Sequence, residues 1–328
     1  MRKPKTLATS LFTLTAATLL ALGAAGPAAA SPAAAKAPAP ADGVSSHLVT
    51  DAGVGYWTPE RMRTAVPGDV LGKKAMERGA PARPSAPVEK GAPSTIETMA
   101  PKAAATVKKA NASESPVPHI GKVFFTLAGT NYVCSGNSVS AGNKNTVSTA
   151  GHCLNEGPGA FATKFTFVPA YQNGSAPYGQ WTAKSLHAPS QWAANGDSTY
   201  DTGFAVMSTL NGQSLSDVVG ASGLQFNAAR GLTYKAFGYP AAAPFNGETL
   251  KSCSGTAKND PYNPQFNSQG IPCNMTGGSS GGPWFIGSSS TGYQNSVNSY
   301  GYGSNSTTMY GPYWGSVIQQ TYTTAAAS

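Results

Sequence analysis

Residues 276–284 (TGGSSGGPW) form a loop in which four glycines bracket two serines. Glycine allows tight turns and lets the backbone approach a ligand closely. Such a loop can aim backbone N–H groups at a point beside a serine hydroxyl, as acyl transfer requires for its oxyanion. Glycine- and serine-rich clusters are also frequent in ordinary loops. The catalytic interpretation therefore depends on a general base and an orienting acid elsewhere in the chain.

A candidate base lies upstream, in residues 149–153 (TAGHC). A serine hydroxyl needs such a base, and an imidazole, with a pKa of about 6.5, can take up a proton and return it. His119 lies at the expected edge of the domain and His187 at an expected strand end. Only His152 combines small neighbours with an adjacent cysteine, so His152 is the predicted base.

Two acids compete to orient that histidine. Asp197 follows an Asn-Gly pair and has the setting of a solvated turn residue. Asp201 directly precedes the apolar run 204–207 (FAVM), which places it at the mouth of a buried strand. A buried carboxylate needs hydrogen-bond partners, and an imidazole N–H would be one. Asp201 is the predicted acid and Asp197 the alternative.

The three motifs together resemble those of the chymotrypsin-like (trypsin-like) serine peptidases, whose nucleophile motif reads GDSGGP and whose histidine motif reads AAHC or TAGHC. The order His, Asp, Ser is also that of this family. The resemblance covers roughly 117–320 and is nearest to the exported bacterial branch related to the V8-like glutamyl endopeptidases. It implies that Ser280, which directly precedes GGP, is the nucleophile, with His152 and Asp201 as its partners. The backbone N–H groups of Gly278 and Ser280 would form the oxyanion hole.

The sequence departs from the animal members of that family at Ser279, where they carry an aspartate that pairs with the new N-terminus on activation. Activation of an inactive precursor would therefore need another mechanism, such as an N-terminal segment that blocks the cleft or assists folding. The resemblance assigns Asn274 to the base of the specificity pocket, and Ser299 and Gly301 to the strand that pairs with the substrate. Asn274 is not the aspartate that selects Lys or Arg. No histidine accompanies that strand, which argues against glutamate specificity.

Four cysteines are present, Cys134, Cys153, Cys253 and Cys273. An even number in an exported chain favours two disulfides. A zinc site is the alternative, but the sequence has no Cys-x-x-Cys or paired-histidine spacing to support it. Of the three possible pairings we favour Cys134–Cys153, which would tie the histidine loop to a neighbouring strand as in the resembled family, and Cys253–Cys273.

The first 115 residues differ in composition from the rest. Residues 1–30 have a basic start, an apolar run and a small-residue end, which is typical of a secretory signal peptide; a membrane anchor is the alternative. Residues 31–115 are rich in Ala and Pro and are expected to be mostly disordered, as a pro-segment or a flexible linker. One short helix is expected after Thr58, with Pro59 at its first position.

The net charge of +8 comes almost entirely from that part of the chain. Residues 1–112 hold 14 Lys and Arg against 7 Asp and Glu, whereas residues 113–328 hold 8 against 7. A nucleic-acid-binding domain would need a basic face, so nucleic acid is not an expected partner. No segment after the signal peptide is long and apolar enough to cross a membrane.

Residues 116–328 are expected to form one all-β domain with a C-terminal helix at 314–322. Short β-branched and aromatic runs alternate there with turn residues. The predicted strands are 122–127, 131–139, 146–149, 161–169, 181–186, 202–207, 232–238, 248–254, 283–286 and 297–302. The resemblance implies two six-stranded antiparallel β-barrels, from about 117–210 and 220–320.

These observations predict a secreted, extracellular and monomeric serine endopeptidase, made as a zymogen with a signal peptide, that acts on proteins or peptides through an acyl-enzyme. No metal or cofactor is implied. Two alternatives remain: a catalytically inactive binding protein on the same fold, and an esterase that uses the same three residues.

Overall fold

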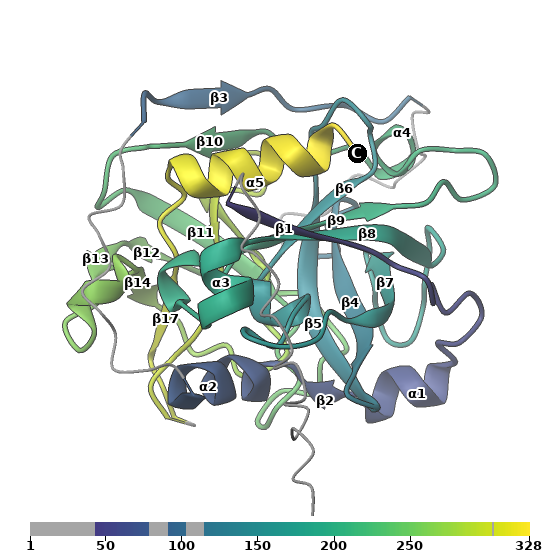
Figure 1. Cartoon of the computed structure of the whole chain (residues 1–328), viewed down its shortest axis with the longest axis horizontal. Coiled ribbons are helices and arrows are strands. Elements are labelled where there is room, and N and C mark those ends of the chain that lie inside the picture. The colour runs from purple at the N-terminus through teal and green to yellow at the C-terminus, as the bar shows by residue number, and fades with distance from the viewer. Residues whose placement is uncertain (1–42, 79–90, 103–114, 304) are drawn as a thin grey trace, which may run out of the picture. The chain divides into compact units, whose positions relative to one another are not determined.

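The computed structural model describes residues 43–78, 91–102, 115–303 and 305–328. Within them, six antiparallel strands close a barrel in the order β8-β7-β4-β5-β6-β9, because β9 pairs back onto β8 (Figure 1). The barrel strands are β4 (Ile120–Leu127), β5 (Thr130–Val139), β6 (Thr146–Thr149), β7 (Thr163–Pro169), β8 (Trp181–Pro189) and β9 (Gly203–Met207).

Strand β4 shows why this barrel is stable. Val123, Phe125 and Leu127 point into the barrel interior, since successive side chains of a strand face opposite ways. Ile120 and Phe124 point outward but are also fully buried, in a second apolar cluster that includes residues of the C-terminal half. Because both faces are covered, the strand is apolar along nearly its whole length instead of alternating with polar residues.

The second half of the chain contributes two further sheets. One has the strand order β12-β11-β15-β16-β10-β3 and the other the order β13-β14-β17. The predicted all-β chymotrypsin-like fold is thus confirmed, with the strands of the second half divided between two hydrogen-bonded sheets. These strands are β10 (Leu224–Phe226), β11 (Thr233–Gly238), β12 (Lys251–Thr256), β13 (Lys258–Asn259), β14 (Gln269–Pro272), β15 (Pro283–Ile286), β16 (Gln294–Val297) and β17 (Thr308–Gly311).

Helices are short, and the C-terminal one packs on the barrel. Phe204 of the barrel and Phe226 of β10 both contact Tyr322 of this helix. The helix was expected at 314–322; it begins later, because Gly315 is its extended N-cap and Trp314 is a fully buried core residue. The helices in the described part of residues 115–328 are η1 (Gly151–Cys153), α3 (Ser190–Asn195), η2 (Ser198–Tyr200), α4 (Leu215–Val219), η3 (Pro264–Phe266) and α5 (Ser316–Ala326).

The N-terminal segment, residues 43–102 where described, is ordered and contacts both halves. It was expected to be mostly disordered, yet three of its strands pair with β8, β5 and β10 of the larger domain. Residues 1–42, which include the predicted signal peptide, lie outside the described part of the chain. The elements of the segment are β1 (Val44–Leu48), α1 (Pro59–Thr64), β2 (Val66–Pro67), α2 (Asp69–Arg78) and β3 (Ser94–Ile96).

The segment is ordered because apolar side chains of the segment pack against the larger domain. Several of its apolar residues are buried: Trp57 is 2% exposed, Met62 4% and Leu71 4%. The short helix expected after Thr58 is confirmed as α1, and the Thr58 side chain accepts a hydrogen bond from the N–H of Arg61 at 3.3 Å.

Most of the predicted strands are found within a few residues of their expected bounds. The stretch 297–302 is the exception, since β16 ends at Val297 and beyond it Tyr300 forms only an isolated bridge with Tyr310. Strands β10, β14 and β17 were not predicted, because β10 is only three residues long and the side chains of β14 and β17 show little apolar alternation.

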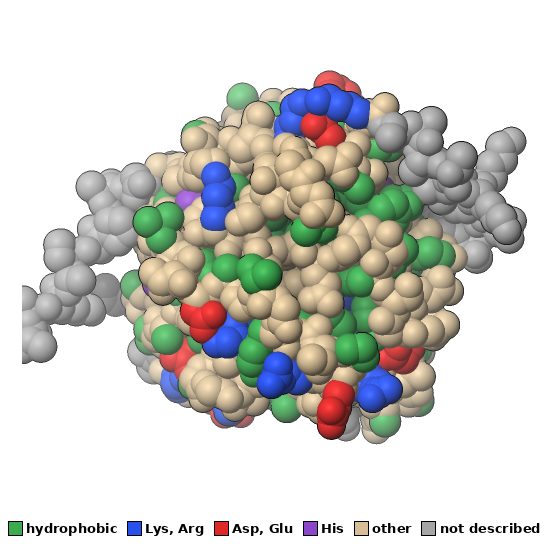
Figure 2. Space-filling model, turned by 90° about the vertical axis from the view of Figure 1, so that its right-hand side faces the viewer, with side chains coloured by type: hydrophobic (Ala, Val, Ile, Leu, Met, Phe, Trp, Pro, Cys, Tyr) green, Lys and Arg blue, Asp and Glu red, His purple; other side chains and the backbone are tan. Residues whose placement is uncertain are grey.

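Charged side chains of both signs are mixed on one face of the molecule. On the face shown in Figure 2, Lys and Arg side chains are interspersed with Asp and Glu. Among the described residues, no helix has both the length and the apolar character needed to cross a membrane.

Candidate active site

His152 lies on the 3₁₀ turn η1, directly after β6 of the barrel. The turn is anchored by the Cys134–Cys153 disulfide, which joins it to β5 as predicted. A side chain at Gly151 would collide with the ring of Trp192 at 2.8 Å, so the chain can turn this tightly only with glycine there. The imidazole of His152 is fully buried.

Asp201, at the start of β9, holds that imidazole. Its Oδ2 lies 2.8 Å from His152 Nδ1, and its Oδ1 accepts the backbone N–H of His152 at 2.8 Å. The Ser299 hydroxyl donates to the same Oδ2. Burial acts to raise the pKa of Asp201, but the neighbouring imidazole and the hydrogen bonds from His152 and Ser299 outweigh it and hold this pKa below its usual range.

The competing acid, Asp197, forms its hydrogen bond within the neighbouring turn. Its side chain accepts the N–H of Thr199 at 2.9 Å and so caps the turn η2. The structure thus brings Asp201, and not Asp197, to His152.

The loop that carries Ser280 is fastened to the strands beside His152. The N–H of Ser135, on β5, donates to the Ser280 carbonyl at 2.7 Å. Gly281 has a φ of +79°, and a Cβ there would lie 2.1 Å from Thr149 Oγ1 and 2.7 Å from the nitrogen of Ala150. The backbone next to Ser280 therefore packs directly against the residues that precede His152.

The two serines of this loop differ in their hydrogen bonding. Ser279 donates its hydroxyl to the carbonyl of Thr276 at 2.8 Å. In the described part of the chain the Ser280 hydroxyl makes no hydrogen bond, and Nε2 of His152 is buried without a partner. A hydroxyl and a ring nitrogen that are both free to act suit the predicted nucleophile and base.

The backbone around Ser280 also offers unused donors. Gly278 has a φ of +94°, a conformation that other residues rarely adopt, and a Cβ there would lie 2.9 Å from the carbonyl oxygen of Tyr239. Among the described residues, no acceptor is bonded to the N–H of either Gly278 or Ser280, whereas the neighbouring Gly281 and Gly282 both donate internally. These two N–H groups are available to a ligand.

A cavity of about 150 Å³ opens beside Ser280. Ser299 and Gly301, which the resemblance assigned to the strand that pairs with the substrate, line it. Asn274 does not: its side chain is exposed, and the cavity is lined instead by its neighbour Met275. Tyr300 and Met309 also line the cavity and were not singled out from the sequence, because no local pattern relates residues 275, 300 and 309.

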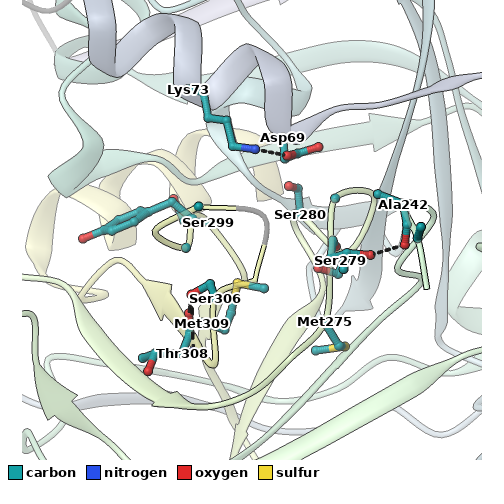
Figure 3. Close-up of a pocket in the computed structure, with 16 residues that line it drawn as sticks. Asp69, Lys73, Ala242, Met275, Ser279, Ser280, Ser299, Ser306, Thr308 and Met309 are labelled. Carbon is teal, nitrogen blue, oxygen red and sulfur yellow. Dashed lines mark hydrogen bonds and ion pairs between the residues drawn. The ribbon is translucent and has the colours of Figure 1, made fainter. Parts of the chain in front are cut away.

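Helix α2 of the N-terminal segment lies over this site. A Cβ at Gly72 would be 3.2 Å from His152 Nδ1, and a Cβ at Gly277 would be 2.0 Å from the Asp69 carboxylate. Asp69 also accepts a hydrogen bond from Lys73 at 2.7 Å, and Figure 3 shows both side chains projecting from α2 toward the loop of Ser280. The segment thus contacts the histidine and the serine loop at once.

The possible metal ligands in the described residues fall into one group, Cys134, His152 and Cys153. Both sulfurs of this group are joined in the disulfide, so neither is a thiolate that could bind zinc. The second predicted disulfide, Cys253–Cys273, is also present.

Two solved structures resemble this chain along almost their whole length. Protease Anisep from Arthrobacter nicotinovorans is 81% identical, with 66% of this chain and 99% of that chain covered and a TM-score of 0.65. The thermostable serine protease AL20 from an extremophilic microorganism is 52% identical, with 64% and 98% covered and a TM-score of 0.63. The chain belongs to the chymotrypsin-like serine peptidases. The predicted class, a serine-type endopeptidase, is confirmed by these relatives.

The remaining likenesses are weaker or cover less of the chain. A Glu endopeptidase in complex with MPD is 22% identical, with 65% of this chain and 92% of that chain covered and a TM-score of 0.52, which concerns the fold alone. No family model matches the chain. An extracellular metalloprotease of Bacillus subtilis (strain 168) is 35% identical over 72 residues, and the chain spans only 22% of that relative's length.

Proposed function

We propose that the protein is a secreted serine endopeptidase in which Ser280, His152 and Asp201 form the catalytic triad. The observation that carries this proposal is the buried His152–Asp201 pair. Two hydrogen bonds from His152 and one from Ser299 fix the carboxylate, while Nε2 is left free beside the serine loop. An imidazole held through Nδ1 presents a basic Nε2, which is what a serine hydroxyl requires.

In the first half of the reaction, Ser280 Oγ attacks the carbonyl carbon of the substrate and its proton passes to His152 Nε2. The carbonyl oxygen gains a negative charge, which the N–H groups of Gly278 and Ser280 stabilise. Asp201 stabilises the imidazolium and keeps its proton on Nδ1. His152 then gives the proton from Nε2 to the leaving amine, and the acyl group remains on Ser280.

The second half repeats these steps with water. His152 Nε2 takes a proton from a water molecule as its oxygen attacks the acyl carbon, and the same two N–H groups stabilise the second oxyanion. The proton then returns from Nε2 to Ser280 Oγ, which releases the acid product.

Export is supported by two features of the chain. Residues 1–30 have the three parts of a secretory signal peptide. Both disulfides belong to the domain itself, and disulfides of this kind persist in oxidising compartments.

We further propose that the protein is made as a zymogen, in which the N-terminal segment is the inhibitory part. Support comes from α2, which contacts His152 through Gly72 and the serine loop through Asp69. Asp69 and Lys73 also border the cavity beside Ser280, so a substrate would have to displace them. The solved relatives correspond to about two thirds of this chain, which agrees with removal of such a segment.

The triad is tested by treating the exported, processed protein with a fluorophosphonate probe and mapping the labelled residue by mass spectrometry. We expect label on Ser280 that is lost after denaturation. Ser280→Ala should abolish labelling and peptide hydrolysis, whereas the matched variant Ser279→Ala should retain both. A folded, processed protein that takes no label would instead be an inactive scaffold. Turnover of esters without any turnover of peptides would identify an esterase.

Inhibition by α2 is tested on the unprocessed chain, carrying any substitution needed to prevent its cleavage. Gly72→Leu adds bulk against the His152 ring and should increase the rate at which the probe labels Ser280. Lys74→Leu introduces the same side chain at an exposed position of the same helix and is the control. Equal labelling rates for the two variants would refute the inhibitory role of α2.

A further inference from the structure

The cavity beside Ser280 has no charged wall once α2 is set aside. Asp69 and Lys73 are the only charged side chains among its described lining residues, and both belong to α2. The remaining walls include the apolar surfaces of Met275, Met309 and Tyr300, together with hydroxyl groups. A charged side chain entering this space would lose its hydration without gaining a counter-charge, which is costly. An uncharged side chain would not incur this desolvation cost.

Tyr300, one of the residues that line the cavity, is held in place by the contacts of its side chain. It stacks on Tyr310 with the ring centroids 5.2 Å apart and the planes at 13°. Its hydroxyl donates to Asp260 Oδ2 at 2.7 Å, and the Tyr302 hydroxyl donates to the same oxygen at 2.6 Å. The ring is therefore fixed by a stacking contact on its face and by a charge-assisted hydrogen bond at its tip.

Asp260 is buried, with 1% of its surface exposed, and is satisfied by neutral donors. Its second oxygen accepts the N–H groups of Tyr262 at 2.9 Å and Asn263 at 3.2 Å. In the described part of the chain no Lys or Arg pairs with it. A buried carboxylate of this kind ties its own loop to the segment of Tyr300 and Tyr302, and removal of a donor leaves it partly unsatisfied.

The segment that Asp260 anchors also contacts the proposed triad. Ser299, the residue before Tyr300, donates its hydroxyl to Asp201, and its N–H donates to the Tyr310 carbonyl at 2.9 Å. Tyr300, which lines the cavity, and Ser299, which bonds to Asp201, are thus adjacent residues of one segment.

We propose that Asp260 is a positioning residue for substrate specificity: by fixing Tyr300, it shapes the cavity beside Ser280 to hold an uncharged, mainly apolar side chain on the acyl side of the cleaved bond. This inference rests on the proposed function, because it assumes that Ser280 is the nucleophile.

The test uses processed enzyme and peptides that differ only in the residue before the cleaved bond, which is Leu, Met, Phe, Glu or Lys. For the wild type we expect kcat/KM at least about tenfold higher with the uncharged residues than with Glu or Lys, since one unpaired charge costs more than 1.4 kcal/mol. Tyr300→Phe keeps the ring but frees its tip. This variant should raise KM for the preferred peptide severalfold and change kcat less. It should also reduce the ratio of kcat/KM between peptides with uncharged residues and peptides with Glu or Lys.

Two further variants separate positioning from general stability. Asp260→Asn should shift the same preferences in the same direction as Tyr300→Phe. Tyr262→Phe should shift none, since its exposed hydroxyl has no hydrogen bond to any residue that the structure describes. A wild-type preference for Glu or Lys would overturn the inference. So would Tyr300→Phe and Asp260→Asn variants that lower the melting temperature but leave the order of preference unchanged. Labelling of Ser280 by the fluorophosphonate probe, measured in parallel, reports separately on the proposed function.

Discussion

Replacing Asp201 by asparagine exchanges one carboxylate oxygen for an NH₂ group at the point where His152 is held. The new amide has two orientations. With its oxygen toward the His152 backbone, it keeps the hydrogen bond now made by Oδ1, and its NH₂ group faces His152 Nδ1 and the Ser299 hydroxyl. In the opposite orientation the NH₂ group would face the buried backbone N–H of His152, and two donors would be left without an acceptor. The first orientation is therefore the expected one.

That orientation forces His152 into the wrong tautomer. The NH₂ group donates to Nδ1, so the proton of the neutral ring must move to Nε2, which then has no lone pair for the proton of Ser280. The loss of such a base in a serine triad lowers kcat by about 10⁴-fold, equivalent to about 5 kcal/mol of barrier. The fold should survive, because the amide still bonds to both residues that contact Asp201.

The measurement is kcat/KM on a peptide near neutral pH, together with the rate of fluorophosphonate labelling and the melting temperature. Asp197→Asn is the matched control, because Asp197 only caps a turn and its loss should cost about 1 kcal/mol of stability or less. Activity of Asp201→Asn within tenfold of the wild type, at an unchanged melting temperature, would refute the assignment. A larger loss in Asp197→Asn would move the triad to that residue.

Three further outcomes are expected. Gly281→Ala should lower the free energy of unfolding in urea by about 2 kcal/mol or more, because φ is +79° and the new Cβ would lie 2.1 Å from Thr149 Oγ1; an unchanged urea midpoint would contradict this. Burial lowers the pKa of Lys122 to about 8, so Lys122→Met should stabilise the protein by about 1–3 kcal/mol at pH 7, with the gain vanishing above about pH 10.5, where the lysine is neutral in both states. Burial also lowers the pKa of His187 to about 4, below its value of about 6.5 in the unfolded chain. The unfolded state then binds the extra proton between these values, so stability should fall as pH drops from about 6.5 to about 4, and His187→Gln should flatten that part of the profile.

The barrel strands were predictable because their apolar residue types indicate that they are buried. Apolar and β-branched runs separated by Gly and Asn gave bounds for β4 to β9 that hold within a few residues. Strands β14 and β17 carry little apolar alternation, so pairing with each other is what defines them. The cavity residues Met275, Tyr300 and Met309 come from separate segments, and Asn274 could not be told from Met275 without knowing which side chain faces inward.

The N-terminal segment also shows that local sequence does not reveal contacts with distant parts of the chain. Its Ala- and Pro-rich composition predicts disorder, because such a chain cannot build a core of its own. The structure orders it on partners far away in sequence, as β1 pairs with β8 and β3 with β10. Unpaired sheet edges supply the backbone hydrogen bonds that composition cannot reveal.

The sequence by itself determined the local chemistry: the family motifs, the order of histidine, aspartate and serine, and the even number of cysteines. Each of these features can be recognised from the residue types and their spacing in the sequence alone. Only the tertiary structure decided which side chains meet. It brought Ser299 to Asp201, Asp260 to Tyr300, and α2 of the N-terminal segment to His152. Such contacts depend on how the strands pair and how the loops turn, which no single stretch of the chain encodes.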